Sequence, residues 1–156
     1  MPYDPAWRLT FDALRQPIAA ALGDLAIAIE HVGSTAVPGL VAKPIIDIDV
    51  IVSPDRADEA IERLGGLGYR HQGDLGIPGR EAFRSPEDTP DHHLYVCPQG
   101  SHEYVRHRQF RDHLRSDAAA RRAYAELKLT AARAAGTDRD AYTRMKSDFI
   151  ERALRS

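Results

Sequence analysis

The sequence has little cysteine, few aromatic residues and no long apolar run. The shortage of cysteine argues against a disulfide-stabilised protein, and the lack of a long apolar run argues against a membrane-spanning one. Cys97 is the only cysteine among 156 residues, so no disulfide can form within the chain, and the composition fits a reducing compartment. The longest nearly continuous apolar stretch, residues 44–52, contains two aspartates and is far shorter than a membrane span. The first residues lack the basic and apolar regions of a signal peptide. We therefore expect a cytoplasmic protein that does not bind membranes.

The sequence also has no large excess of positive or negative charge. The formal charge is −2, which argues against a nucleic-acid partner. Hydrophobic residues make up 43% and charged residues 28%, which is typical of a globular protein. A chain of this length can bury about two-thirds of its unfolded surface without a disulfide or a structural metal. We expect one domain over residues 1–156.

Hydrophobic periodicity predicts where the helices and strands lie. Apolar residues recur at helical spacing from Trp7 to Leu22, and Gly23 ends that helix. Strands are predicted at residues 25–32, 45–52, 69–72, 81–84 and 93–97, with a helix at 53–64. Helices follow from about residue 102, with breaks near 116–117 and 136–138. This order predicts an α+β fold, in which helices pack on a mixed sheet and the C-terminal third is helical.

The most informative feature is Asp47-Ile48-Asp49 in the strongest predicted strand. Residues i and i+2 of a strand point to the same face, so the two carboxylates lie about 6–7 Å apart. Like charges on a buried strand need compensation, and Mg²⁺ or Mn²⁺ is a natural partner for carboxylate oxygens. The alternatives are a strand edge that faces solvent, or aspartates that pair with arginines.

Gly33-Ser34 ends the preceding predicted strand. Glycine permits close approach of a phosphate, and the serine and the amides that follow it can donate hydrogen bonds to that phosphate. Taken alone, the pair is better explained by an ordinary strand-ending turn. Its position just before the Asp47-x-Asp49 strand favours a phosphate site.

Together these motifs resemble the DNA-polymerase-β-like nucleotidyltransferase superfamily, and most closely its GrpB family, whose domain also occurs fused to some dephospho-CoA kinases. The resemblance covers nearly the whole chain, and its central block is residues 29–40 and 43–50. The other matching residues are Tyr3, Pro5, Trp7, Gly68, Tyr69, residues 76–80, His93, Leu94, Phe110, Arg111, Asp112, Leu114, Arg115, Tyr124, Leu127, Lys128, Tyr142, Lys146, Phe149 and Ile150.

The resemblance implies that Gly33 and Ser34 contact nucleotide phosphates and that Asp47 and Asp49 are catalytic metal ligands. A third carboxylate commonly lies on a later strand, but the predicted strand 92–97 contains none. His93 either replaces the third acid as a metal ligand or general base, or is a structural imidazole. The sequence is compatible with either role for His93.

Basic residues are needed to compensate the charge of a bound phosphate. The candidates for this role match family positions or lie in loops near the motifs: Lys43, Arg80, Arg111 and Lys128. The alternative for each is an ordinary solvated face. A zinc site is not favoured, because the histidines match no H-E-x-x-H pattern.

Two classes of function follow from these features. In the first, an enzyme transfers a nucleoside monophosphate from a nucleoside triphosphate to an unknown small-molecule or protein acceptor, and Mg²⁺ or Mn²⁺ is its cofactor. In the second, a non-catalytic accessory domain binds a nucleotide or a CoA-type ligand. The link to coenzyme A rests on the family resemblance alone.

Overall fold

The computed structural model describes residues 2–76, 78–135 and 139–155. The elements, in chain order, are the helices α1 (Ala6–Leu22), α2 (Ala57–Gly65), α3 (His102–Ser116), α4 (Ala118–Ala135) and α5 (Arg139–Arg155), with the strands β1 (Ala28–Val32), β2 (Ile46–Val52), β3 (Arg70–Gly73), β4 (Glu81–Arg84) and β5 (His92–Pro98). Short 3-10 turns lie at η1 (Gly23–Leu25), η2 (Ser34–Ala36) and η3 (Pro54–Arg56).

The five strands form one sheet in the order β1-β2-β5-β4-β3. Strand β2 pairs antiparallel with β1 and parallel with β5, while β4 pairs antiparallel with both β5 and β3. The sheet is therefore mixed, and the three C-terminal helices follow it in the chain. The predicted α+β class, with a mixed sheet and a helical C-terminal third, is confirmed.

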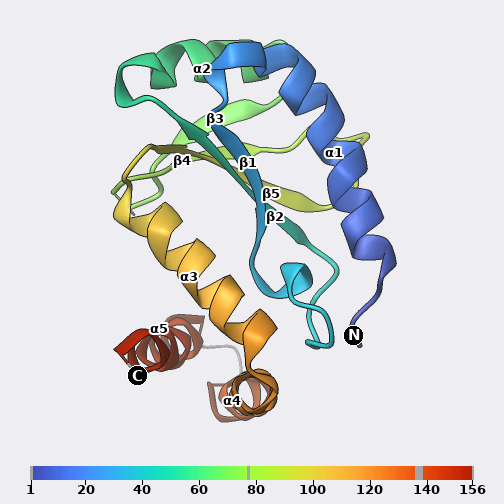
Figure 1. Ribbon diagram of the computed structural model, residues 1–156, viewed down its shortest axis with the longest axis vertical. Coiled ribbons are helices and arrows are strands. Elements are labelled where there is room, and N and C mark those ends of the chain that lie inside the picture. Colours follow the sequence, from blue (N-terminus) through green and yellow to red (C-terminus); the bar gives the residue numbers. More distant parts are fainter. Residues whose placement is uncertain (1, 77, 136–138, 156) are drawn as a thin grey trace.

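The two faces of β2 have different partners. Ile46, Ile48, Val50 and Val52 are buried in a core that they share with α1 and α2. The alternate residues point to the opposite face, where Ile51 packs beside Tyr104 of α3. Figure 1 shows α2 at the top of the sheet, α1 running down its right side, and α3 leading down to α4 and α5. Asp47 and Asp49 therefore lie on the face that receives the helical third.

Several predicted boundaries shift by a few residues. The strand expected at residues 25–32 starts at Ala28, because Gly23–Leu25 forms a 3-10 turn whose Leu25 is buried in the core. A 3-10 turn, Pro54–Arg56, also precedes α2. The predicted break at 116–117 is confirmed, and the break predicted at 136–138 lies outside the described residues.

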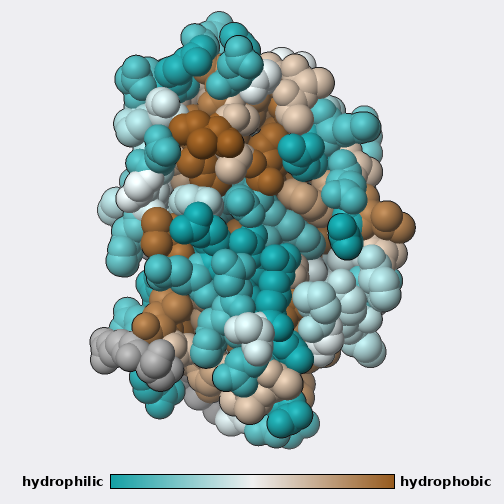
Figure 2. Space-filling model, viewed as in Figure 1, coloured by the Kyte–Doolittle hydropathy of each residue, from teal (hydrophilic) through white to brown (hydrophobic). Residues whose placement is uncertain are grey.

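A second core joins the helical third to the segment between β1 and β2. Val37 and Leu40 of that segment pack against Phe110, Leu114 and Tyr124. On the face seen in Figure 2, hydrophilic side chains dominate the middle of the molecule. No helix in the described ranges is both long enough and apolar enough to cross a membrane.

Candidate active site

The site begins where β1 ends. Val32 lies opposite Asp47 in the antiparallel register, so the next residue, Gly33, passes beside the Asp47 carboxylate. Gly33 has φ 76° and ψ −174°, a combination that essentially only glycine adopts. A Cβ atom at this position would collide with Asp47 Oδ2 and lie 3.0 Å from Asp47 Cγ. Gly33 is thus required both by the backbone conformation and by the adjacent carboxylate.

Asp47 is paired with an imidazole from the neighbouring strand. His93 lies directly opposite Asp47 in the parallel β2–β5 register, and its Nδ1 is 2.9 Å from Asp47 Oδ1. This hydrogen bond raises the pKa of His93 above its ordinary value. His93 is therefore tied to Asp47 on the functional face of the sheet and does not point into the core.

Asp49 is in a different environment from Asp47. Its side chain is fully buried, and Oδ2 is 2.9 Å from Nδ1 of His107 on α3. The other oxygen, Oδ1, is buried and has no hydrogen-bond partner. Burial is the main cause of a raised pKa for this carboxyl, and the His107 hydrogen bond opposes it. We expected both aspartates to project into one cleft, but only Asp47 lines the pocket, because α3 covers Asp49.

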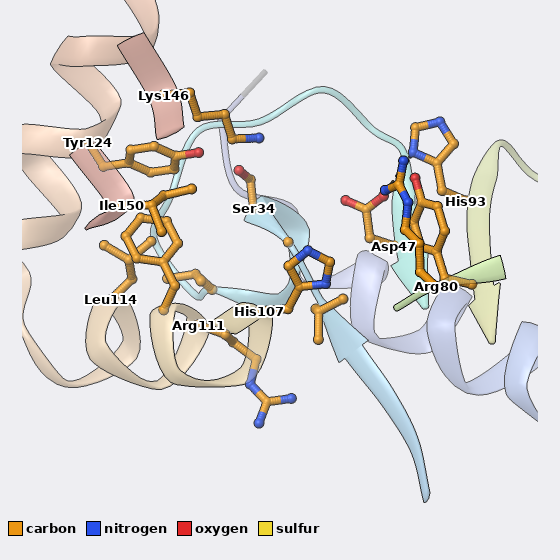
Figure 3. A pocket seen from close by; sticks show the side chains of 15 residues that line it. Ser34, Asp47, Arg80, His93, His107, Arg111, Leu114, Tyr124, Lys146 and Ile150 are labelled. Atoms are coloured by element: carbon orange, nitrogen blue, oxygen red, sulfur yellow. Dashed lines mark hydrogen bonds and ion pairs between the residues drawn. The ribbon is translucent and has the colours of Figure 1, made fainter. Parts of the chain in front are cut away.

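We call the cavity beside Asp47 the carboxylate pocket. Its volume is about 330 Å³, and its lining residues come from the sheet and from the three C-terminal helices. Figure 3 shows Asp47, His93 and Arg80 on one side of this pocket, with Tyr124, Lys146, Ile150 and Leu114 on the other and Ser34 between them. One wall is therefore charged, and the opposite wall is largely apolar and aromatic. The pocket is lined by Val32, Gly33, Ser34, Val37, Asp47, Arg80, His93, Tyr95, His107, Phe110, Arg111, Leu114, Tyr124, Lys146 and Ile150.

Of the predicted phosphate-binding cations, Arg80 lines the pocket, and Lys128 bonds Ser34, which lines it. The Arg80 guanidinium stacks 4.5 Å above the Tyr95 ring, and its buried Nε has no hydrogen-bond partner. Lys128 Nζ donates to Ser34 Oγ at 3.0 Å and to the Val41 carbonyl at 3.1 Å. Burial lowers the pKa of Lys128 to about 8, and nearby Lys146 adds to that effect. Lys128 therefore holds the serine of the loop directly.

The other two predicted cations are placed differently. Lys43 is exposed and is not part of the pocket lining. The stem of Arg111 lines the pocket, but its guanidinium points away (Figure 3). That guanidinium binds Glu30 Oε2 at 2.7 Å, Asp112 Oδ1 at 3.0 Å and the His31 carbonyl at 3.0 Å. In this conformation Arg111 joins α3 to β1, and its Nε and one terminal nitrogen bond protein groups.

His107 and Lys146 also line the pocket, although neither is among the site residues predicted from the sequence. His107, Phe110, Arg111 and Leu114 all line the pocket from α3 at i, i+3, i+4 and i+7 spacing. This spacing was the signal in the sequence that could have identified His107, because it places the histidine on the same helical face as residues of the family pattern. Nothing in the local sequence indicates that His107 pairs with Asp49, which lies 58 residues earlier.

His31 supports the loop from the side away from the pocket. Its Nε2 is 2.9 Å from Thr35 Oγ, and its ring stacks on Phe11 with centroids 4.8 Å apart. Burial lowers its pKa to about 4, so the imidazole is neutral at physiological pH. Among the described residues, no group of three or more His, Cys, Asp and Glu side chains is arranged to hold a metal ion.

The sequence matches the GrpB protein family over residues 1–156. It is 40% identical to the UPF0157 protein PA4798 of Pseudomonas aeruginosa, in a match covering 99% of this chain and 65% of that protein. It is 28% identical to a dephospho-CoA kinase of Mycolicibacterium paratuberculosis, covering 99% of this chain and 44% of the kinase. The chain thus spans less than two thirds of the length of both relatives.

Solved structures extend the comparison. The crystal structure of the conserved protein GrpB from Enterococcus faecalis superposes with a TM-score of 0.83 and 32% identity, over 99% of this chain and 96% of that chain. Cid1 in complex with the UTP analogue UMPNPP matches at a TM-score of 0.44 and 12% identity, over 82% of this chain and 43% of that chain, which is too distant to support an argument about function. On the full-length match and the close structural similarity, the chain belongs to the GrpB family.

Proposed function

We propose that this protein is a metal-dependent nucleotidyltransferase that moves a nucleoside monophosphate from a nucleoside triphosphate to an acceptor. The observation that carries the proposal is the contact between the Gly33 backbone and the Asp47 carboxylate at one end of the carboxylate pocket. The glycine loop that would bind phosphate and the carboxylate that would bind a cation therefore lie side by side. Arg80 and Lys146 line the same pocket, and Lys128 bonds Ser34 from α4.

The residues present fit a cation that is held partly by substrate. Each aspartate has one oxygen bound to an imidazole, which leaves Asp47 Oδ2 beside Gly33 and Asp49 Oδ1 without a partner. Mg²⁺ commonly takes only one or two carboxylates and fills its remaining positions with phosphate and water. Asp47, the one of the two aspartates that lines the pocket, would therefore hold the cation together with phosphate and water, without a third protein acid. The bound cation would neutralise phosphate charge.

The chain's own groups have distinct roles in the proposed reaction. Arg80 and Lys146 bind and orient the phosphates, and Lys128 positions Ser34 beside them. The acceptor hydroxyl attacks the α-phosphorus, the bond to the bridging oxygen breaks, and pyrophosphate leaves. Neutral His93 takes the hydroxyl proton at Nε2, because its Nδ1 is held by Asp47 and the Asp47 charge makes the imidazole a stronger base.

The test is incubation of the protein with Mg²⁺, each labelled nucleoside triphosphate in turn, and cell extract as the source of acceptor. We expect pyrophosphate release and one labelled product, both of which Asp47→Asn abolishes. Asp74→Asn is the matched control, since Asp74 is an exposed carboxylate in the β3–β4 loop that accepts a hydrogen bond from Gly76 N and does not line the carboxylate pocket. Pyrophosphate release that is unaffected by Asp47→Asn would count against the proposal.

A non-catalytic role is the second candidate, and two observations favour it. Both aspartates already have imidazole partners, and the described part of β5 supplies no third carboxylate. Because a dephospho-CoA kinase contains a region similar to this chain, a CoA-type compound is the ligand to test. Saturable binding of a CoA compound or a nucleotide, with no pyrophosphate released under any condition, would select this candidate.

A further inference from the structure

A second cavity, which we call the rear cavity, lies behind the loop that forms the carboxylate pocket. Its volume is about 460 Å³, and its walls come from α1, β1, the η2 turn and the end of α3. Successive loop residues divide between the two cavities: Gly33, Ser34 and Val37 line the carboxylate pocket, whereas Thr35 and Ala36 line the rear cavity. The two linings share no residue, so the rear cavity is a separate site.

Two guanidinium groups give the rear cavity its charge. Arg115 is fixed at the wall, because its Nε donates to the Ala36 carbonyl at 2.9 Å. Its terminal nitrogens form no hydrogen bond or ion pair with the described residues. Arg8, on α1, also lines the cavity and has no hydrogen bond or ion pair within the described ranges. Ten donor positions on two guanidiniums are thus largely available to a ligand.

The other polar groups at the cavity leave a net positive charge. His31 is neutral at physiological pH, because burial and the nearby Arg115 lower its pKa to about 4. Asp12 contributes one negative charge against the two arginines. Tyr3 adds a hydroxyl that can donate a hydrogen bond. The cavity therefore favours a compact anion with several acceptor oxygens.

We propose that the rear cavity is a second anion-binding site, which takes the phosphate group of a small ligand between Arg8 and Arg115. Guanidinium groups match phosphate oxygens with parallel hydrogen bonds, which a rigid and partly fixed Arg115 favours further. The site is independent of the proposed transfer reaction, and it gives a role to Tyr3 and Arg115, which belong to the family pattern but have none at the carboxylate pocket.

The experiment is an NMR titration that follows the ring signals of His31 and Phe11, which line the rear cavity and not the carboxylate pocket. Inorganic phosphate is titrated first and methyl phosphate second, to distinguish the free ion from a phosphomonoester. We expect saturable shifts with at least one of them. Arg8→Gln and Arg115→Gln should each weaken that affinity roughly tenfold.

Arg80→Gln is the control, since Arg80 lines only the carboxylate pocket and should leave the affinity measured at His31 unchanged. Arg8→Gln is decisive if Arg115→Gln disturbs the loop, because Arg8 has no hydrogen bond or ion pair to lose among the residues that the structure describes. The proposal is overturned if neither probe gives saturable shifts. It is also overturned if Arg80→Gln removes them while Arg8→Gln does not, since phosphate then binds only at the carboxylate pocket.

Discussion

At the scale of single residues, Gly33 is the position where fold and site constrain each other most closely. We expect Gly33→Ala to destabilise the protein by about 1–3 kcal/mol from backbone strain alone. A further loss comes from the collision of the new methyl group with the Asp47 carboxylate. Urea unfolding measures the total. Gly73→Ala is the control, because Gly73 has a similar φ of 74° and nothing within 4 Å of its Cβ position.

The collision can be separated from the strain by a double-mutant cycle. In an Asp47→Ala background the carboxylate is gone, so Gly33→Ala should cost less than it does in the wild-type protein. Some cost remains, since a Cβ at Gly33 also lies 3.1 Å from Asp47 Cβ. Equal costs in the two backgrounds would show that the contact with the carboxylate is unimportant.

His93 provides a second prediction at this scale. The Asp47 hydrogen bond raises the pKa of His93, so Asp47→Asn should lower that pKa towards its ordinary value near 6.5. The ion pair contributes stability fully below the unfolded-state pKa, and that contribution is lost as pH rises through the folded-state pKa. NMR titration of the imidazole checks the shift. The signal for comparison is His92, whose pKa is lowered mainly by burial and only secondarily by His93, so it should shift less.

At the scale of secondary structure, α4 is tied to the loop after β1 through Lys128. Burial lowers the Lys128 pKa to about 8 from 10.5, so the unfolded state binds more protons than the folded state between these pH values. The free energy of unfolding of the wild type, relative to Lys128→Met, should therefore rise as pH increases from about 8 to 10.5. Urea unfolding at several pH values measures this. A difference that is constant with pH would show that Lys128 has an ordinary pKa.

The elements also show what sequence alone could predict. Helix α1 and strand β2 were predictable, because the helical spacing from Trp7 to Leu22 and the β-branched run around Asp47 are local patterns. The pleat likewise places Asp47 and Asp49 on one face. Which of the two reaches the pocket was not predictable, since His107 on α3 covers Asp49 from far along the chain. The same holds for Arg111, whose guanidinium binds Glu30 of β1, 81 residues earlier.

At the scale of the whole molecule, the carboxylate pocket lies at the interface between the sheet and the helical third. Its charged wall belongs to the sheet and the loop after β1, whereas Phe110, Tyr124 and Ile150 come from the helical third. A ligand that fills the pocket contacts both parts of the fold. Since only the folded chain brings these walls together, ligand binding must stabilise the folded state by linkage.

The size of this effect can be predicted. A nucleoside triphosphate with Mg²⁺ at about 100 times its Kd should add about 2.7 kcal/mol to the free energy of unfolding. For a domain of this length, each kcal/mol raises Tm by about 2–4 °C, so the expected rise is roughly 5–10 °C. Thermal unfolding followed by circular dichroism measures it. Asp47→Asn/Asp49→Asn should unfold at the same temperature with and without the ligand, whereas Arg8→Gln, altered only at the rear cavity, should keep the full rise. Both candidate functions require a ligand that binds between the sheet and the helical third. They would be contradicted if no nucleotide or CoA compound, at millimolar concentration and with Mg²⁺ present, raised the Tm of the wild-type protein.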